Sequence, residues 1–597
     1  MTTQTADQPA RSTESRRHQH TERLRALREK MAQHGVDALI VRSTDRYLNE
    51  YVPQAESTRE WLTGFTGSMG DALVTREAAF VVVDGRYHLQ ADQETDPAHW
   101  TVVKLSMAEP IYSGVLGKLQ EQVRSGAVKA VGYETDRFTV HEREALDRML
   151  EGTTAKSVPL AVSPVEEVRG PVRLKPGELR ILDEARVGRS AAEKVAAVQK
   201  ALEQAGLDLF LVQKLDDLAY LTNLRADELP YQATFKGMGA VGRQGALVCF
   251  HSRTAPEALP AARPGFRFVD EKALPQALQE IAGPGRKAAY DASATTEAAR
   301  QLLVAAGFTA LPMSGPLTEM KARKTGAELT RMVEAFRKAD RVVSQAISWL
   351  CRAVEKGEKV TEADFASKVE KTFRRSGAVG LSFKVISAAG ANGAIIHYST
   401  PDPERVIQRG ELMLLDTGAY YEDGYATDLT RTFLAGGSRT QATDEQKRLY
   451  TLTLKSAIAG MTAVVPQGVS GVALDAITRK PLWDHGLNYN HGTGHGVGIN
   501  VHEAPPSISM RSTTPLGAGY VFSIEPGVYL PGWGGIRIEN LCTLEEHPEH
   551  KGWLRVKPLT FSPLDPRLID QKLLSPSEKA FVKEFQAQGK AALRAQA

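Results

Sequence analysis

Residues 411–433 read ELMLLDTGAYYEDGYATDLTRTF, and the pattern of this stretch decides the predicted fold. Apolar and aromatic residues flank the sequence Glu-Asp-Gly at 422–424, which is typical of a β-hairpin. Asp416 and Asp428 then lie on neighbouring strands among apolar residues, where an unpaired charge is costly. Turn formation does not account for either aspartate, so both are candidates for a functional site.

Two further stretches supply more acids and a histidine. Residues 521–540 read VFSIEPGVYLPGWGGIRIEN, which predicts a second hairpin around its Pro-Gly turn. Glu525 lies on the first strand of that hairpin and Glu539 on the second. Residues 491–505 read HGTGHGVGINVHEAP, a glycine-rich segment that contains His495. Two hairpins that carry carboxylates can bring four acids together.

These residues form a set of hard ligands. Four carboxylates in one place repel one another, and divalent cations neutralise such a cluster. The set has no thiolate, which disfavours structural zinc or copper and suits manganese, cobalt, iron or catalytic zinc. Each residue taken singly is explained as an exposed side chain or a turn residue, so the joint pattern carries the prediction. The candidate metal ligands are Asp416, Asp428, His495, Glu525 and Glu539.

The stretches resemble the motifs of pita-bread metallopeptidases, and most closely those of the aminopeptidase P (Xaa-Pro aminopeptidase) family in its long, three-domain cytosolic form. The resemblance runs from about residue 25 to the C-terminus. It implies removal of the N-terminal residue from peptides with proline second, by a hydroxide shared between two metal ions. It also implies manganese as the usual metal, with zinc or cobalt as alternatives. Asp416 would hold one ion, Asp428 and Glu539 both, and His495 and Glu525 the other.

The same resemblance implies the catalytic residues. SAAGANGAIIHYSTP, at 387–401, is similar to the family segment that carries a catalytic histidine, here His397. His491 and His502 match the other active-site histidines and Arg537 the active-site arginine, while Glu525 would also transfer the proton of the nucleophile. The two aspartates are twelve positions apart (428 − 416), one more than the family usually has. We expect the extra residue at the hairpin tip.

The N-terminal half contains an internal duplication. GVDALIVRSTDRYLNEY begins at Gly35 and GLDLFLVQKLDDLAYLTNL at Gly206, each after a basic amphipathic helix, with an offset of 171 residues (206 − 35). The period is too long for a solenoid, so it predicts two similar α/β domains. Asp216 and Asp217 lie in the second copy, and we expect these neighbours to point apart, as adjacent strand or loop residues do. A scaffold and dimer role follows for this domain.

The predicted fold class is therefore α/β plus α+β. From about residue 316 helices alternate with antiparallel hairpins, which favours an α+β domain. Thr361 with Asp364 is typical of a capping box at the start of a helix. By resemblance, two creatinase/prolidase N-terminal-like α/β domains precede a pita-bread catalytic domain. The expected ranges are a disordered tail at 1–20, an α/β domain at 21–170, its duplicate at 171–315, and the catalytic domain with a C-terminal extension at 316–597.

Composition limits the remaining possibilities. The 597 residues are too many for one domain, and the net charge of +3 gives no support for binding nucleic acid or an acidic membrane. Three distant cysteines cannot form a disulfide framework, which predicts a reducing compartment and a cytoplasmic protein. Short peptides with proline second are the expected partners. The resemblance further implies a homodimer.

Three alternatives stay open. A prolidase, which cleaves only Xaa-Pro dipeptides, usually has one α/β domain before the catalytic domain instead of two. A non-catalytic pita-bread protein would bind peptides, histones or RNA, although such relatives have lost metal ligands. A creatinase-like hydrolase does not keep this ligand set. The glycine-rich stretch at 492–498 does not fit the phosphate-binding GxGxxG or P-loop patterns, and HExxH is absent from the sequence.

Overall fold

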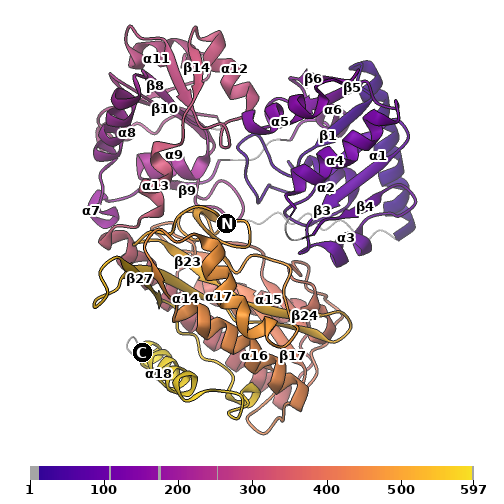
Figure 1. Ribbon diagram of the computed structural model, residues 1–597, viewed down its shortest axis with the longest axis vertical. Coiled ribbons are helices and arrows are strands. Elements are labelled where there is room, and N and C mark those ends of the chain that lie inside the picture. Colours follow the sequence, from indigo (N-terminus) through magenta and orange to yellow (C-terminus); the bar gives the residue numbers. More distant parts are fainter. Residues whose placement is uncertain (1–12, 107–108, 173–175, 252, 595–597) are drawn as a thin grey trace. The chain divides into compact units, whose positions relative to one another are not determined.

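The structure is a computed structural model that describes residues 13–106, 109–172, 176–251 and 253–594. Contacts divide the chain into two compact units, Met1–Leu174 with Ala292–Gln301 and Lys175–Asp291 with Leu302–Ala597. Within the described ranges, none of the helices is both long and apolar enough to cross a bilayer. Figure 1 shows the elements of both units.

The first unit contains a six-stranded sheet with helices on both faces. Its strands are β1 (Ala38–Val41), β2 (Asp71–Thr75), β3 (Ala79–Val83), β4 (Thr101–Lys104), β5 (Ala130–Glu134) and β6 (Lys156–Leu160). Its helices are α1 (Thr13–Gln33), α2 (Thr58–Thr63), α3 (His88–Glu94), α4 (Ile111–Arg124), α5 (Val140–Leu150) and α6 (Pro164–Arg169). The spatial order of the strands is β4-β3-β2-β1-β5-β6.

Strand β1 shows why helices cover both faces of this sheet. Successive strand residues point to opposite faces. Leu39 and Val41 pack in one apolar cluster with residues of α1, whereas Ala38 and Ile40 pack in another with residues of α4. All four residues are fully buried, and this double burial explains the unbroken apolar run of the strand.

The second unit begins with a sheet of the same design. Its strands are β8 (Leu209–Val212), β10 (Gly237–Gly242), β11 (Gly245–Phe250), β12 (Phe266–Val269), β13 (Lys287–Tyr290) and β14 (Thr309–Pro312), beside a small pair of β7 (Leu179–Ile181) and β9 (Leu224–Ala226). The helices are α7 (Glu184–Val187), α8 (Ala191–Ala205), α9 (Leu215–Thr222), α10 (Leu259–Ala262) and α11 (Leu274–Ala282), while α12 (Glu297–Ala305) has its first residues in the first unit and its last in the second.

The two sheets correspond strand for strand, which confirms the predicted duplication. The order of the second sheet is β12-β11-β10-β8-β13-β14. The central strand β8 runs antiparallel to β10 and parallel to β13, as β1 does to β2 and β5. One prediction about this domain is wrong: Asp216 and Asp217 lie in the first turn of helix α9, not in a strand or loop, and both carboxylates contact Lys321.

The rest of the second unit is the predicted α+β domain. Its helices are α13 (Pro316–Ala322), α14 (Gly326–Glu355), α15 (Glu362–Arg375), α16 (Asp444–Met461), α17 (Gly471–Trp483) and α18 (Pro576–Arg594), with short 3-10 helices η1 (Gly390–Ala394) and η2 (Pro566–Leu568). Its strands are β15 (Gly380–Leu381), β16 (Ile386–Ala389), β17 (Leu412–Thr417), β18 (Ala419–Tyr420), β19 (Leu429–Leu434), β20 (Val464–Pro466), β21 (Gly494–Gly496), β22 (Glu503–Ile508), β23 (Val521–Ile524), β24 (Gly527–Leu530), β25 (Gly534–Arg537), β26 (Asn540–Glu546) and β27 (Trp553–Pro558).

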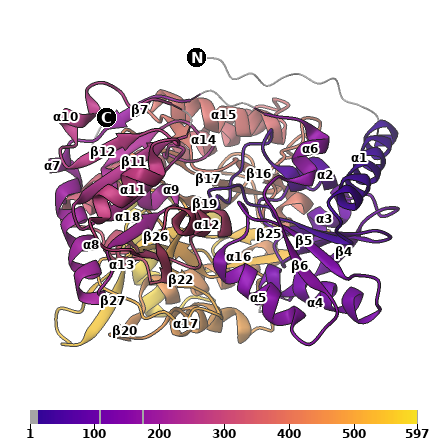
Figure 2. The same cartoon turned by 90° about the horizontal axis from the view of Figure 1, so that it is seen from above.

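Two antiparallel sheets and two helix pairs form this domain. The sheet β16-β17-β19 packs against α14 and α15 in one apolar cluster. The sheet β20-β27-β26-β23-β21-β22 packs against α16 and α17 in another. In Figure 2, α14 and α15 lie above β17 and β19. The expected capping box of Thr361 and Asp364 opens α15, and the α+β prediction is confirmed.

The N-terminal tail differs in part from its prediction. Residues 1–12 lie outside the described residues, but helix α1 begins at Thr13, before the expected domain start at residue 21. The stretch from 13 to 20 has no glycine or proline and includes arginine, glutamine and glutamate. These residue types have moderate to high helix propensity, so the helix extends toward the N-terminus through them.

Candidate metal and active site

The two predicted hairpins are present, and Asp416 lies within a strand as predicted. The prediction that the other three acids lie on hairpin strands is wrong, because each lies immediately beside the end of a strand. Asp416 lies on β17 opposite Thr430 on β19, and Asp428 immediately precedes β19. Strands β24 and β25 form the second hairpin. Glu525 lies between β23 and β24, and Glu539 between β25 and β26. The hairpin geometry therefore turns residues more than 100 positions apart toward one region.

Three of the five candidate ligands converge closely. One ligand atom each from Asp428, His495 and Glu539 lies within 4.8 Å of the other two. Glu525 joins them, because its Oε1 atom lies 3.4 Å from His495 Nε2, the same distance as Asp428 Oδ2. His495 Nδ1 faces the carbonyl oxygen of Gly496 at 3.2 Å, so Nε2 is the ring atom directed at the carboxylates.

The cluster carries more negative charge than its protein partners neutralise. Burial, together with the charges of Asp428 and Glu525, raises the pKa of Glu539 well above its usual value. Burial also raises the pKa of Glu525 to about 7. Burial alone would lower the pKa of His495, but Asp428 and Glu525 raise it to about 9. Mutual repulsion of buried carboxylates is the pattern that a divalent cation relieves.

Asp416 is not part of the closest group. Its Oδ2 atom accepts a hydrogen bond from Arg537 Nη2 at 2.7 Å. Burial raises the pKa of Asp416, and the Arg537 guanidinium opposes that shift. Arg537 Nε also donates to Thr430 Oγ1, and Thr430 Oγ1 donates to Glu539 Oε2 at 2.7 Å. This chain of bonds connects Asp416 to the cluster through Arg537 and Thr430.

Tyr529 is a site residue that sequence reasoning missed. Its hydroxyl lies 2.8 Å from both His491 Nε2 and Arg537 Nη1, so one phenol joins two of the predicted catalytic residues. Burial raises the pKa of Tyr529 to about 12, which keeps the phenol protonated. In the sequence, Tyr529 is marked by its position on a predicted strand, four residues after Glu525. Strand periodicity alone does not distinguish Tyr529 from its neighbours on that strand.

The remaining histidines take different positions. The ring of His502 packs edge-on against His495, with centroids 4.2 Å apart, so it lies beside the cluster. His397 is half-buried in the segment after η1. The preceding η1 packs closely on β25, since a Cβ added to Gly393 would lie 2.8 Å from Gly535 N. Arg537 Nη1 donates to Ile396 O at 3.3 Å.

The donor set fits a hard divalent cation. Asp416 Oδ1 and Glu539 Oε1 are buried oxygen atoms that have no hydrogen-bond partner within the described chain. Leaving buried carboxylate oxygens unpaired is costly. Oxygen atoms together with one imidazole nitrogen are donors that manganese, cobalt or zinc accepts. The residues therefore match the kind of ion that the sequence predicts.

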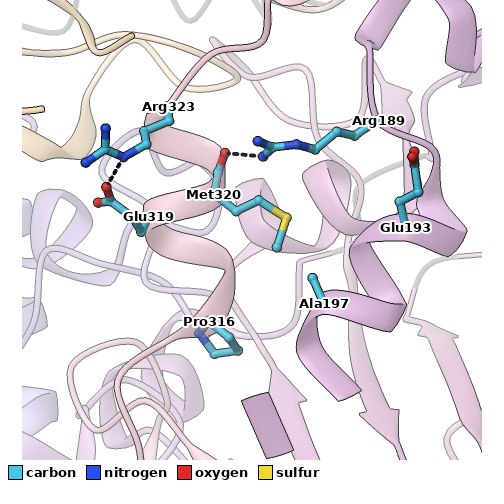
Figure 3. A pocket seen from close by; sticks show the side chains of 7 residues that line it. All are labelled: Arg189, Glu193, Ala197, Pro316, Glu319, Met320 and Arg323. Carbon is cyan, nitrogen blue, oxygen red and sulfur yellow. Dashed lines mark hydrogen bonds and ion pairs between the residues drawn. The ribbon is translucent and has the colours of Figure 1, made fainter. Parts of the chain in front are cut away.

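A separate groove of about 470 Å³ lies between α8 and α13. Figure 3 shows that its arginines are already engaged: Arg189 donates to Met320 O, and Arg323 pairs with Glu319. None of the predicted site residues, all of which the structure describes, lines this groove. Its lining residues are Arg189, Glu193, Ala197, Pro316, Glu319, Met320 and Arg323.

Comparison with known families divides the chain into three parts. Residues 334–546 match the family described as metallopeptidase family M24. Residues 23–169 and residues 171–328 each match a family described as the creatinase/prolidase N-terminal domain. The two N-terminal matches agree with the duplicated sheets.

Similar proteins span nearly the whole chain. A protein of Sordaria macrospora named probable Xaa-Pro aminopeptidase P is 36% identical, over 94% of each chain. One of Laccaria bicolor with the same name is 32% identical, over 95% of this chain and 89% of its own. The crystal structure of an X-prolyl aminopeptidase from Caenorhabditis elegans, described as a cytosolic enzyme with a di-nuclear active site, aligns with a TM-score of 0.89 at 26% identity, over 96% of each chain.

A prolidase aligns less completely. The structure of the prolidase from Pyrococcus horikoshii OT3 has a TM-score of 0.52 at 25% identity. It covers 63% of this chain and 100% of its own. More than a third of this chain therefore has no counterpart in that enzyme.

Proposed function

The chain belongs to the Xaa-Pro aminopeptidase P family of metal-dependent hydrolases, and from this premise we propose that it removes the N-terminal residue from peptides with proline in the second position. The observation that carries the proposal is the convergence of Asp428, His495 and Glu539 within 4.8 Å. A non-catalytic relative that had lost its ligands would have no reason to keep such a cluster of buried acids.

Two divalent ions would be held by the five predicted ligands. The family resemblance assigns Asp428 and Glu539 to both ions, and both residues belong to the convergent cluster. We propose manganese as the metal, with zinc or cobalt as alternatives that the donor set also accepts. The complete set is Asp416, Asp428, His495, Glu525 and Glu539.

The chain's own groups would orient the substrate and move the proton. When bound, a pair of divalent cations supplies Lewis acidity, which polarises the carbonyl before proline and lowers the pKa of a water molecule, so that the water can lose a proton and attack that carbonyl as hydroxide. Glu525 would accept the proton of that water, since its carboxylate lies at the edge of the cluster, 3.4 Å from His495 Nε2. It would then pass the proton to the leaving proline nitrogen.

The histidines and Arg537 would serve the same reaction in different ways. His397 and His502 would donate hydrogen bonds to the substrate carbonyl as negative charge develops there. His491 and Arg537 would orient the ligating side chains without binding the ions themselves, and the Tyr529 hydroxyl is bonded to both residues. Arg537 would also fix the carboxylate of Asp416, which it contacts at 2.7 Å.

We propose further that the domains divide near residues 170 and 315 and that the two α/β domains restrict access to short peptides. The protein would act in the cytoplasm as a homodimer, without binding nucleic acid or membranes. Support for the compartment comes from three unpaired cysteines and from the Caenorhabditis elegans enzyme, which is described as cytosolic. Analytical ultracentrifugation at several protein concentrations tests the dimer.

A peptide panel tests the function directly. Full-length protein is freed of metal with EDTA, supplied with Mn²⁺, and incubated with Arg-Pro-Pro, the dipeptide Arg-Pro and Arg-Ala-Ala. We expect release of arginine from Arg-Pro-Pro only, and only after metal is restored. Cleavage confined to Arg-Pro would identify a prolidase instead. No cleavage of any peptide when Mn²⁺, Zn²⁺ and Co²⁺ are supplied in turn would refute the proposed peptidase activity.

A further inference from the structure

The segment that carries His397 has little regular structure of its own. It follows strand β16, begins with the 3-10 helix Gly390–Ala394, and continues as turns and irregular backbone from 395 to 405. Such a segment is held in one conformation only by bonds from its surroundings. Residues outside the segment must therefore supply these bonds.

One buried carboxylate collects donors from both ends of the segment. Glu362, the first residue of α15, has no exposed surface. Its Oε1 atom accepts from Ala389 N at 2.6 Å and from Asn392 Nδ2 at 3.0 Å. Its Oε2 atom accepts from Tyr398 OH at 2.7 Å and from Asp402 N at 3.1 Å. Four donors on one carboxylate make a strong, fully satisfied anchor.

These bonds fix the residue that follows His397, and another bond fixes the residue before it. Tyr398 is bound to Glu362, while Ile396 O accepts from Arg537 Nη1 at 3.3 Å. Burial and the neighbouring Glu362 carboxylate raise the pKa of Tyr398, which keeps its hydroxyl available as a donor. The backbone of His397 is therefore held on both sides.

We propose that Glu362 is a positioning residue for His397: its carboxylate holds the segment 389–402 in the conformation that presents the His397 imidazole to the substrate. The inference rests on the proposed function for the role of His397 itself. Among the described residues, Glu362 makes no hydrogen bond or ion pair with a candidate ligand, so it acts through the segment. Because a displacement of about 1 Å can cost roughly 100-fold in rate, the effect of losing this anchor is large.

The test compares the full-length enzyme with the variant Glu362→Gln. Glutamine has the same shape but offers one acceptor oxygen, and its amide donors would face donors of the segment. We expect hydrogen exchange of the peptide spanning 389–402 to become faster by about tenfold or more. We also expect kcat/KM for Arg-Pro-Pro to fall about 100-fold, mainly through kcat, while the manganese bound per chain is unchanged.

A double variant shows whether the loss passes through His397. In the His397→Ala background, Glu362→Gln should cause little additional loss, because residues that act through one group are not additive. Thr361→Ala is the matched control. It removes the N-cap of the same helix without touching the segment, so it should lower stability and leave kcat/KM and the exchange of 389–402 unchanged.

A milder variant covers the case in which Glu362→Gln does not fold. Tyr398→Phe removes one of the four donors and leaves the carboxylate in place, and it should produce a smaller change in the same direction. Unchanged exchange of 389–402 in Glu362→Gln, or rate losses that multiply in the double variant, would overturn the positioning role. Absence of Xaa-Pro hydrolysis by the unmodified protein would instead overturn the proposed function.

Discussion

The two α/β domains have the same sheet topology, but an equivalent buried aspartate has different partners in each domain. Asp45 follows β1 at the position that, 171 residues later, is Asp216 after β8. Asp45 is satisfied locally, because its carboxylate accepts from Tyr47 N at 2.9 Å and from Asn49 N at 3.0 Å. Asp216 is paired with Lys321, a residue of helix α13 outside its own sheet.

The second α/β domain thus shares its buried charge with α13, the first helix of the catalytic domain. Burial alone would raise the pKa of Asp216, but Lys214 and Lys321 lower it below its usual range. Nearby, Lys324 Nζ lies 3.0 Å from Glu503 Oε2, and both side chains are almost fully buried. Glu503 Oε1 in turn accepts from Ile499 N at 2.7 Å. The ion pair of Lys324 and Glu503 therefore holds the loop that carries His502 to the segment after α13.

Among the variants that test this comparison, replacement of Lys321 should cause the largest loss in the free energy of unfolding. Lys321→Met leaves Asp216 and Asp217 buried without their cation, and removal of one partner of a buried pair costs about 3–5 kcal/mol. Urea unfolding should show a loss of that size in the free energy of unfolding. The matched control is Lys214→Met, which removes a one-third exposed lysine 3.8 Å from the same Asp216; it should cost about 1 kcal/mol or less. Equal losses in the two variants would contradict the comparison.

The first domain has its own buried acid, and its pH dependence gives the next largest effect. Burial raises the pKa of Glu134 to about 7 from a usual value of 4.5. The folded protein then binds this proton more tightly than the unfolded chain between pH 4.5 and 7, so stability falls as pH rises through that window. The size of the change is about 3 kcal/mol.

Glu134→Gln tests that assignment because glutamine does not titrate. Its free energy of unfolding should decline less than that of the unmodified protein between pH 5 and pH 7.5. Thermal unfolding at the two pH values measures the difference. Parallel profiles for the two proteins would show that Glu134 does not control the pH response of this domain.

The ion pair at the first hairpin tip should have the smallest effect. Arg186 of the second domain contacts Asp423 through Nε at 2.9 Å and through Nη2 at 2.8 Å. Arg186 is 40% exposed, and exposed pairs contribute about 0.2–1 kcal/mol. Arg186→Ala should therefore lower the free energy of unfolding by less than about 1 kcal/mol. A loss as large as that of Lys321→Met would mean that exposed and buried contacts hold the domains equally.

Local patterns predicted much of this molecule. The glycine-led repeats after Gly35 and Gly206 predicted the duplicated sheets, because in both copies an apolar strand follows a basic amphipathic helix. Apolar runs on either side of the Glu-Asp-Gly and Pro-Gly turns predicted the two hairpins. Acids among apolar residues, with a nearby histidine, predicted the cluster of Asp428, His495 and Glu539. These features depend on neighbours in sequence, so they are visible without a structure.

Contacts between distant residues could not be predicted in this way. Glu362 meets Tyr398 over a separation of 36 positions, and Lys321 meets Asp216 over 105. The prediction that Asp216 and Asp217 point apart rests on a strand or loop at these positions, whereas the helical turn brings both to one lysine. Nothing local distinguishes such partners from exposed charges, since burial decides their role.

Metal stoichiometry tests the central claim most directly. Metal-free preparations of the unmodified chain and of Asp428→Asn are titrated with Mn²⁺. The manganese bound per chain is then quantified by inductively coupled plasma mass spectrometry. We predict about two ions per chain for the unmodified protein, and for Asp428→Asn fewer ions and no detectable Arg-Pro-Pro hydrolysis despite a normal unfolding curve. Equal metal content and near-normal turnover in the variant would contradict the account.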